Sequence, residues 1–176
     1  SNVGDCLIAK DRKTDNELLG ICNASFTSLI LSAIAPTLHF EVGQIAQIPF
    51  VNSENIVEDD NVKKLIFISQ YDWNSFETSW DFQRFTLLDP NQGAQAGDLL
   101  EDAVSHLREY WDRVSEEQRQ REIRNNELVA DAYGVRDGVP CDVPLERVSL
   151  KRNVAFAYPK DTPEARNEKF AQRSEE

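Results

Sequence analysis

Apolar residues recur at helical spacing through most of this chain, and polar segments separate the runs. The longest run starts at Asp98 and carries Leu100 and Leu107 on one face, which is typical of a helix with one buried stripe. Another run starts at Ser25 and ends before Pro36, because proline disfavours helical backbone in the residue that precedes it. We therefore predict that helices make up most of the protein.

Helix-end signals indicate further helices. Capping residues, or acidic residues that suit the positive end of a helix dipole, precede apolar runs at 15–16, 59–60 and 162–163. Gly134 follows the run at 127–133 and suits the left-handed residue that ends many helices. Residues 115–126 alternate Glu, Gln and Arg without an apolar stripe. This pattern is typical either of a solvated helix or of a break between two helices.

Short extended segments are predicted between the helices. Residues 6–9 are mostly apolar, and apolar residues alternate with polar ones in two pieces at 38–42 and 45–50, which indicates strands. Residues 143–150 and 153–158 read as two more extended pieces. The predicted class is therefore α+β, mainly helical with a few short strands, built as one compact domain with a helical extension.

Five aromatic rings fall within residues 71–82, interleaved with acidic and hydroxyl residues. Each buried ring removes a large apolar area from water, so we predict a structural aromatic core made of Trp73, Phe76, Trp80 and Phe82. The alternative is a platform on which unstacked bases lie. The core is preferred because nearby carboxylates would repel a phosphate backbone, namely those of Asp72, Glu77 and Asp81.

Charge and cysteine usage limit the classes of function. The 31 acidic and 19 basic residues give a formal charge of −12, the opposite of a free-standing nucleic-acid binder. The balance favours solubility or docking on a basic partner. Cys6, Cys22 and Cys141 form no close pair, which predicts neither a disulfide framework nor a zinc site and fits the cytoplasm. The sequence contains no run of eighteen apolar residues, so no membrane span is predicted.

The sequence contains no motif of a known catalytic or cofactor site. Phosphate-binding glycine loops and zinc-protease motifs are absent, and the two histidines, His39 and His106, lie far apart in sequence. We therefore predict no catalytic, cofactor-binding or metal-binding residues. The chain also lacks Met and starts Ser1-Asn2, as after tag removal, so we expect a segment of a longer protein.

Several segments resemble the PglX-type adenine-specific DNA methyltransferases of BREX phage-defence systems. The most specific is DWNSFETSWDF at 72–82, and 35–49, 126–135, 143–150 and 153–159 are similar to further family segments in the family's order. The resemblance implies a parent enzyme that transfers a methyl group from S-adenosylmethionine to adenine N6. The cofactor loop and the Asn-Pro-Pro-Tyr motif of that chemistry do not occur in this chain.

The resemblance also implies a division of the chain by role. Residues 1–16 are a tag remnant with an N-terminal strand and loop, and 17–83 close the target-recognition region and include the aromatic connector. Residues 84–97 form a loop, and 98–176 form a helical spacer truncated within its last helix. The implied function is DNA recognition and spacing in the full enzyme. The alternative is an acidic protein-interaction module that docks other defence proteins.

The DNA-backbone candidates are basic residues in three parts of the chain. The densest cluster lies at 119–124, where salt bridges with neighbouring glutamates are the preferred interpretation and phosphate contacts the alternative. The complete set of candidates is Lys63, Lys64, Arg119, Arg121, Arg124, Lys151 and Arg152.

Overall fold

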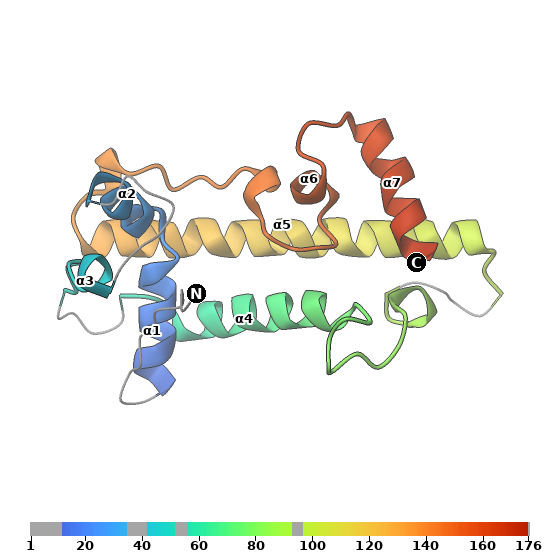
Figure 1. The fold of residues 1–176 in the computed structure, drawn as a ribbon, viewed down its shortest axis with the longest axis horizontal. Helices are drawn as coiled ribbons and strands as arrows, with labels where there is room; N and C mark the ends of the chain where they lie inside the picture. The colour runs from blue at the N-terminus through green and yellow to red at the C-terminus, as the bar shows by residue number, and fades with distance from the viewer. Residues whose placement is uncertain (1–11, 35–41, 52–55, 93–96, 176) are drawn as a thin grey trace. The chain divides into compact units, whose positions relative to one another are not determined.

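The computed structural model describes residues 12–34, 42–51, 56–92 and 97–175. The protein is mainly helical, and no strand occurs in these four ranges (Figure 1). The predicted α+β class is therefore wrong. The α-helices are α1 (Arg12–Cys22), α2 (Ser25–Ile34), α3 (Val42–Ile45), α4 (Asp59–Asn74), α5 (Leu100–Ala132), α6 (Val154–Ala157) and α7 (Pro163–Glu175). Three short 3-10 helices are η1 (Thr86–Leu88), η2 (Arg136–Gly138) and η3 (Leu145–Arg147).

In the segments predicted as strands, backbone groups form hydrogen bonds with nearby residues instead of with another strand. The piece at 153–158 contains α6, which the Asn153 side chain caps by accepting from Ala155 N at 3.0 Å. The Asn153 amide also donates to the carbonyls of Leu145 and Val148, so 143–150 curls around η3. In the 45–50 piece, α3 and a turn replace the strand. The predicted strand at 6–9 lies outside the described residues, and so does the one at 38–42 except for Val42, which begins α3.

Two compact units replace the predicted single domain with an extension. The first comprises residues 1–64 and 121–142, and the second comprises 65–120 and 143–176. Both α4 and α5 contribute residues to each unit. The helix α5 continues through 115–126, so this segment is not a break between two helices. It is not a fully solvated helix either, because Ser115, Gln118, Asn125 and Asn126 are buried. The division by role, in contrast, stays a prediction.

The first unit packs α1, α2 and the C-terminal part of α5 around small and branched residues. Ile21, Ala24 and Val129 are fully buried there. Gly20 permits the close approach of its neighbours, because a Cβ at this position would lie 2.9 Å from Val57 Cγ1. The Asn125 side chain donates to the Gly20 carbonyl at 2.8 Å.

The second unit is built on the N-terminal part of α5. Leu107 and Trp111 of this helix are buried with Val154 of α6 and Phe170 of α7, and Figure 1 shows both shorter helices beside α5. A neighbouring cluster joins Ile68 of α4 to the segment after η3, through Val148 and Leu150. This packing carries the end of α4 and the residues that follow it, where the candidate site lies.

Candidate functional site

The aromatic stretch does not form one core. Trp80 is 102% exposed and Trp73 is 52% exposed, whereas Phe76 and Phe82 are partly buried. The physical reason is that α4 ends at Asn74, so the helical spacing that would place Trp80 on the same face as Trp73 is not continued. The tryptophan at the centre of this unit is instead Trp111, which is 1% exposed.

A buried carboxylate joins the end of α4 to the segment before α6. The side chain of Asp72 accepts hydrogen bonds from Lys151 N at 2.7 Å and from Arg152 N at 2.9 Å. Burial raises the pKa of Asp72 above its usual range, although the two backbone donors oppose this shift. The carboxylate therefore fixes the position of two consecutive basic residues.

These two basic residues lie over aromatic rings from the stretch at the end of α4. The ammonium of Lys151 lies 4.1 Å from the centre of the Trp73 ring, and the guanidinium of Arg152 lies 4.3 Å from that of Phe76. Arg152 also donates to the hydroxyl of Ser75 at 3.2 Å and to its carbonyl at 3.1 Å. Both ring contacts are cation–π contacts, in which a cation is attracted to the electron-rich face of an aromatic ring.

The other basic candidates have polar partners within their own units. Lys63 pairs with Asp59, Arg124 pairs with Glu58, and Arg121 donates to the Asn61 side chain. The Lys64 side chain is partly buried. In the part of the chain that the structure describes, the Lys151 ammonium pairs with no carboxylate. The seven candidates are divided between the units: Lys63, Lys64, Arg121 and Arg124 belong to the first, and Arg119, Lys151 and Arg152 belong to the second.

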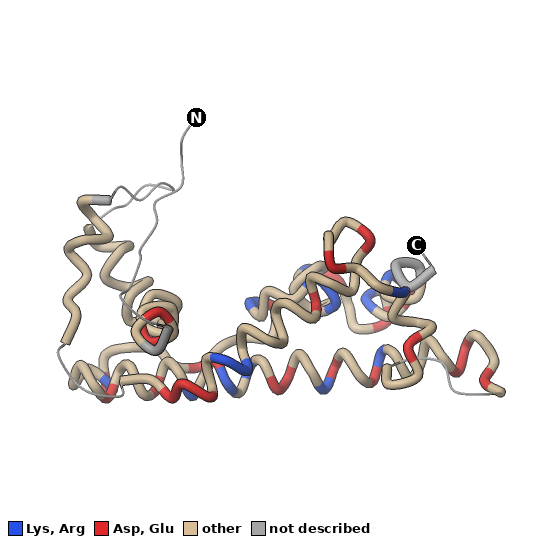
Figure 2. Tube along the Cα trace, turned by 90° about the horizontal axis from the view of Figure 1, so that it is seen from below, with Lys and Arg blue, Asp and Glu red and all other residues tan. Residues whose placement is uncertain are grey.

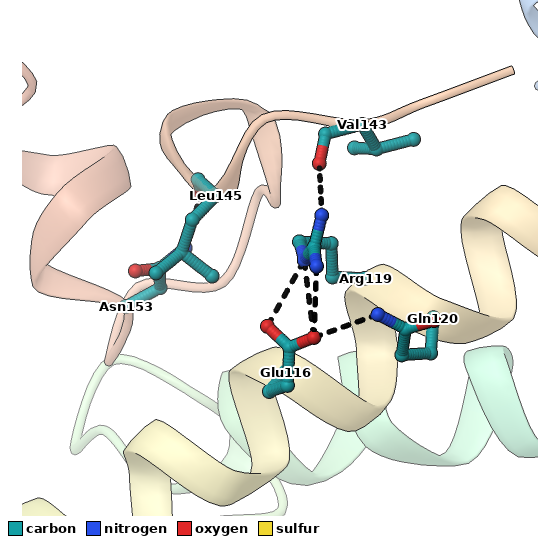
Figure 3. Close-up of polar contacts among 6 residues, drawn as sticks. All are labelled: Glu116, Arg119, Gln120, Val143, Leu145 and Asn153. Carbon is teal, nitrogen blue, oxygen red and sulfur yellow. Dashed lines mark hydrogen bonds and ion pairs between the residues drawn. The ribbon is translucent and has the colours of Figure 1, made fainter.

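Arg119 forms a salt bridge with a neighbouring residue of its own helix, α5. Its guanidinium lies between the Glu116 carboxylate, at 2.9 Å, and the Val143 carbonyl, at 3.3 Å (Figure 3). Figure 2 shows acidic and basic residues interspersed along this helix. The salt-bridge interpretation therefore describes Arg119, although a phosphate contact in a complex remains a prediction.

A polar cleft of about 230 Å³ opens beside the end of α4. Its lining includes Tyr71 and Asn74 from the helix, together with Asp81, Arg84 and Asp89 from the segment that follows. Burial is the main cause that raises the pKa of the Tyr71 phenol. Sequence reasoning missed this cleft, because it joins residues of the aromatic stretch to residues of the predicted loop at 84–97, and their spacing does not show that they face one another.

The described ranges contain neither a metal-binding cluster nor a single membrane-spanning helix. No group of three or more His, Cys, Asp or Glu residues is close enough there to hold a metal ion. No single helix among those residues has the length and apolar character to cross a membrane, although the bent pair Thr14–Cys22 and Ser25–Ile34 together meets those two criteria.

Comparison with known proteins relates the chain to adenine-specific methyltransferases. It is 27% identical over 151 residues to the adenine-specific methyltransferase PglX of Lacticaseibacillus casei (strain Zhang), a match that covers 83% of this chain and 13% of that protein. It is 26% identical over 141 residues to the adenine-specific methyltransferase BrxX of Escherichia coli O9:H4 (strain HS), covering 80% of this chain and 11% of the relative. No protein-family model matches the chain.

These similarities confirm the predicted relation to PglX-type and BrxX-type methyltransferases. The matched part spans only 11% to 13% of the length of these two relatives.

Proposed function

We propose that this chain is a non-catalytic region of a site-specific adenine-N6 DNA methyltransferase of a bacterial BREX phage-defence system, where it serves DNA recognition and spacing. Its similarity to PglX and BrxX supports the type of parent enzyme. S-adenosylmethionine would bind the rest of that enzyme, because the motifs of that chemistry are absent from this sequence. The enzyme would act on host DNA in the cytoplasm.

The observation that supports the proposed DNA contact is the position of Lys151. Its ammonium lies over Trp73 and 4.9 Å from the Phe76 ring centre, and its backbone is held by Asp72. A phosphate that approaches this cation need not displace a carboxylate first. Release of counterions from the DNA then contributes to the affinity.

The paired arginines of α5 contribute less in this proposal. A phosphate must compete with Glu116 for Arg119 and with Glu58 for Arg124. Since exposed ion pairs are weak, about 0.2–1 kcal/mol, such competition is feasible. We nevertheless expect Lys151 to have the larger effect.

The test is DNA binding by the full-length methyltransferase, measured by fluorescence anisotropy across a range of salt concentrations. Lys151→Gln should weaken binding roughly uniformly across sequences and reduce the salt slope by about 1. Lys160→Gln removes an equal charge at an exposed position and serves as the matched control. Equal affinities and equal salt slopes for the two variants would count against the proposal.

A second candidate function is an acidic protein-interaction module that docks other components of the defence system. It is favoured by the formal charge of −12 and by the exposed Trp80 between the exposed acids Glu77 and Asp81. The test is titration of the chain with each purified component of the system. Binding that survives neutralisation of Glu77 and Asp81 would exclude these acids as the docking face.

A further inference from the structure

Trp80 projects from a turn that is fixed by hydrogen bonds. Ser79, which is buried, donates from its backbone to the Phe76 carbonyl at 2.9 Å and from its hydroxyl to Asn74 Oδ1 at 2.7 Å. The same hydroxyl accepts from Asp81 N at 3.2 Å. The indole next to this anchored serine is 102% exposed. These bonds therefore fix the backbone that carries the ring, and the ring itself lies in water.

An indole held in this way is suited to insertion into a pocket. Tryptophan is enriched among the residues that dominate binding energy at protein interfaces, because one rigid side chain buries a large apolar area. Other exposed apolar side chains follow it in the same unit, including Phe85 at 43% and Leu88 at 66%.

The charges around Trp80 indicate which surface would cover it. Glu77 and Asp81 are exposed on either side of it, and Asp81 and Asp89 line the adjoining cleft with one cation, Arg84. Carboxylates in this arrangement attract basic side chains and repel phosphates. A protein surface with lysines or arginines therefore fits better than a nucleic acid.

We propose that the turn at 75–82 and the adjoining cleft form an intramolecular docking element of the larger methyltransferase. Trp80 enters an apolar pocket on another part of that polypeptide, and a basic side chain from the rim of the pocket enters the cleft beside Asp81 and Asp89. The proposal rests on the proposed function only in taking the chain as a region of a longer enzyme. The two relatives extend far beyond the matched part, so a larger enzyme of this kind has further polypeptide on which such a pocket can lie.

The experiment is hydroxyl-radical footprinting, read at single residues by mass spectrometry. It compares this chain alone with the full-length methyltransferase, each with and without duplex DNA. Trp80 should be oxidised rapidly in the chain alone, and buried Trp111 slowly in both proteins. In the full-length enzyme without DNA, Trp80 labelling should fall by about five-fold or more, as expected for the dry centre of an interface.

Two results would overturn the docking element. One is equal labelling of Trp80 in the two proteins, and the other is protection that appears only when DNA is added. The second result would assign the ring to DNA instead of to protein.

A variant tests the role of the acidic cleft separately. Asp81→Asn keeps the shape of the side chain and removes one charge, so Trp80 labelling in the full-length enzyme should rise about two- to five-fold, the range of a weak ion pair. Asp137→Asn, an exposed change in the first unit, is the control and should have no effect. If Trp80 labelling is the same in these two variants, no basic side chain enters the cleft beside Asp81, and that part of the proposal is wrong.

The outcomes separate this inference from the proposed function. Protection of Trp80 together with unchanged DNA binding by Lys151→Gln supports docking and opposes the DNA contact. Weaker DNA binding by Lys151→Gln, together with rapid labelling of Trp80 in the full-length enzyme, supports the DNA contact and opposes docking.

Discussion

The buried side chain of Asp72 connects two segments that are distant in sequence. Its two oxygens accept from consecutive backbone amides at 151 and 152, so the contact depends on the path of the main chain and not on the basic character of those residues. A search for complementary charges in the sequence would pair Asp72 with the wrong atoms. The same bond positions Lys151 over Trp73.

The raised pKa of Asp72 predicts a specific pH dependence of stability. The folded state holds this proton more tightly than the unfolded state, where the pKa is about 3.9. Asp72 therefore adds to the free energy of unfolding in full below that value. This contribution is lost as pH rises through the pKa of Asp72 in the folded state. Most ion-paired carboxylates have the opposite effect.

The measurement compares urea unfolding of the wild type and Asp72→Asn from pH 3 to pH 7, roughly the range in which carboxyl groups titrate. The stability difference between the two should fall as pH rises above about 4. Asp137→Asn is the exposed control. A carboxyl NMR titration that gives Asp72 a pKa at or below the usual range would contradict the expectation.

Among the secondary-structure elements, α6 depends most on a single side chain. Asn153 is 4% exposed, caps the helix at Ala155 N, and donates to the carbonyls of Leu145 and Val148 at 2.8 and 2.9 Å. One amide therefore ends the preceding segment and starts the helix. The short helix in turn places Val154 in the core with Trp111.

Asn153→Ala should lower the free energy of unfolding by about 2–4 kcal/mol, because it removes a cap and leaves buried backbone groups without partners. Chemical denaturation measures this change. Asn167→Ala, on the exposed side of α7, is the matched control and should change stability by less than about 0.5 kcal/mol. Similar losses for both variants would show that the Asn153 contacts do not form.

Helix ends were predictable to different degrees along the chain. The caps at 59–60 and 162–163 and the left-handed Gly134, with φ of +66°, mark real helix ends because capping is a local interaction. The end of α4 at Asn74 was not predictable from spacing alone. It depends on Asp72 and Ser75, whose partners lie some 77 to 80 residues later.

At the scale of the whole molecule, each unit combines segments that are not contiguous in sequence. The first takes its core from the N-terminal helices and the end of α5, and the second takes its core from α4, the start of α5 and the C-terminal helices. A division by consecutive sequence cannot find such units. Only contacts between distant residues define them.

The chain in solution should give a far-UV circular dichroism spectrum of a mainly helical protein, with about 65% helix and no distinct sheet component. Helical content follows from the 33-residue α5 and the shorter helices. Infrared spectroscopy in the amide region is the complementary measurement. A substantial sheet signal from the monomeric chain would contradict the fold.

The sequence by itself determined the helical character, most helix starts, the acidic charge and the relation to adenine-specific methyltransferases, because periodicity, capping and motifs are local properties. Only the tertiary structure decided that Trp73 and Trp80 lie at the surface while Trp111 is buried. It also placed the Lys151 ammonium over the Trp73 ring, with no carboxylate paired to it among the described residues. The physical reason is that burial and ion pairing depend on which distant segments pack together, and the spacing of residues along the chain does not contain that information.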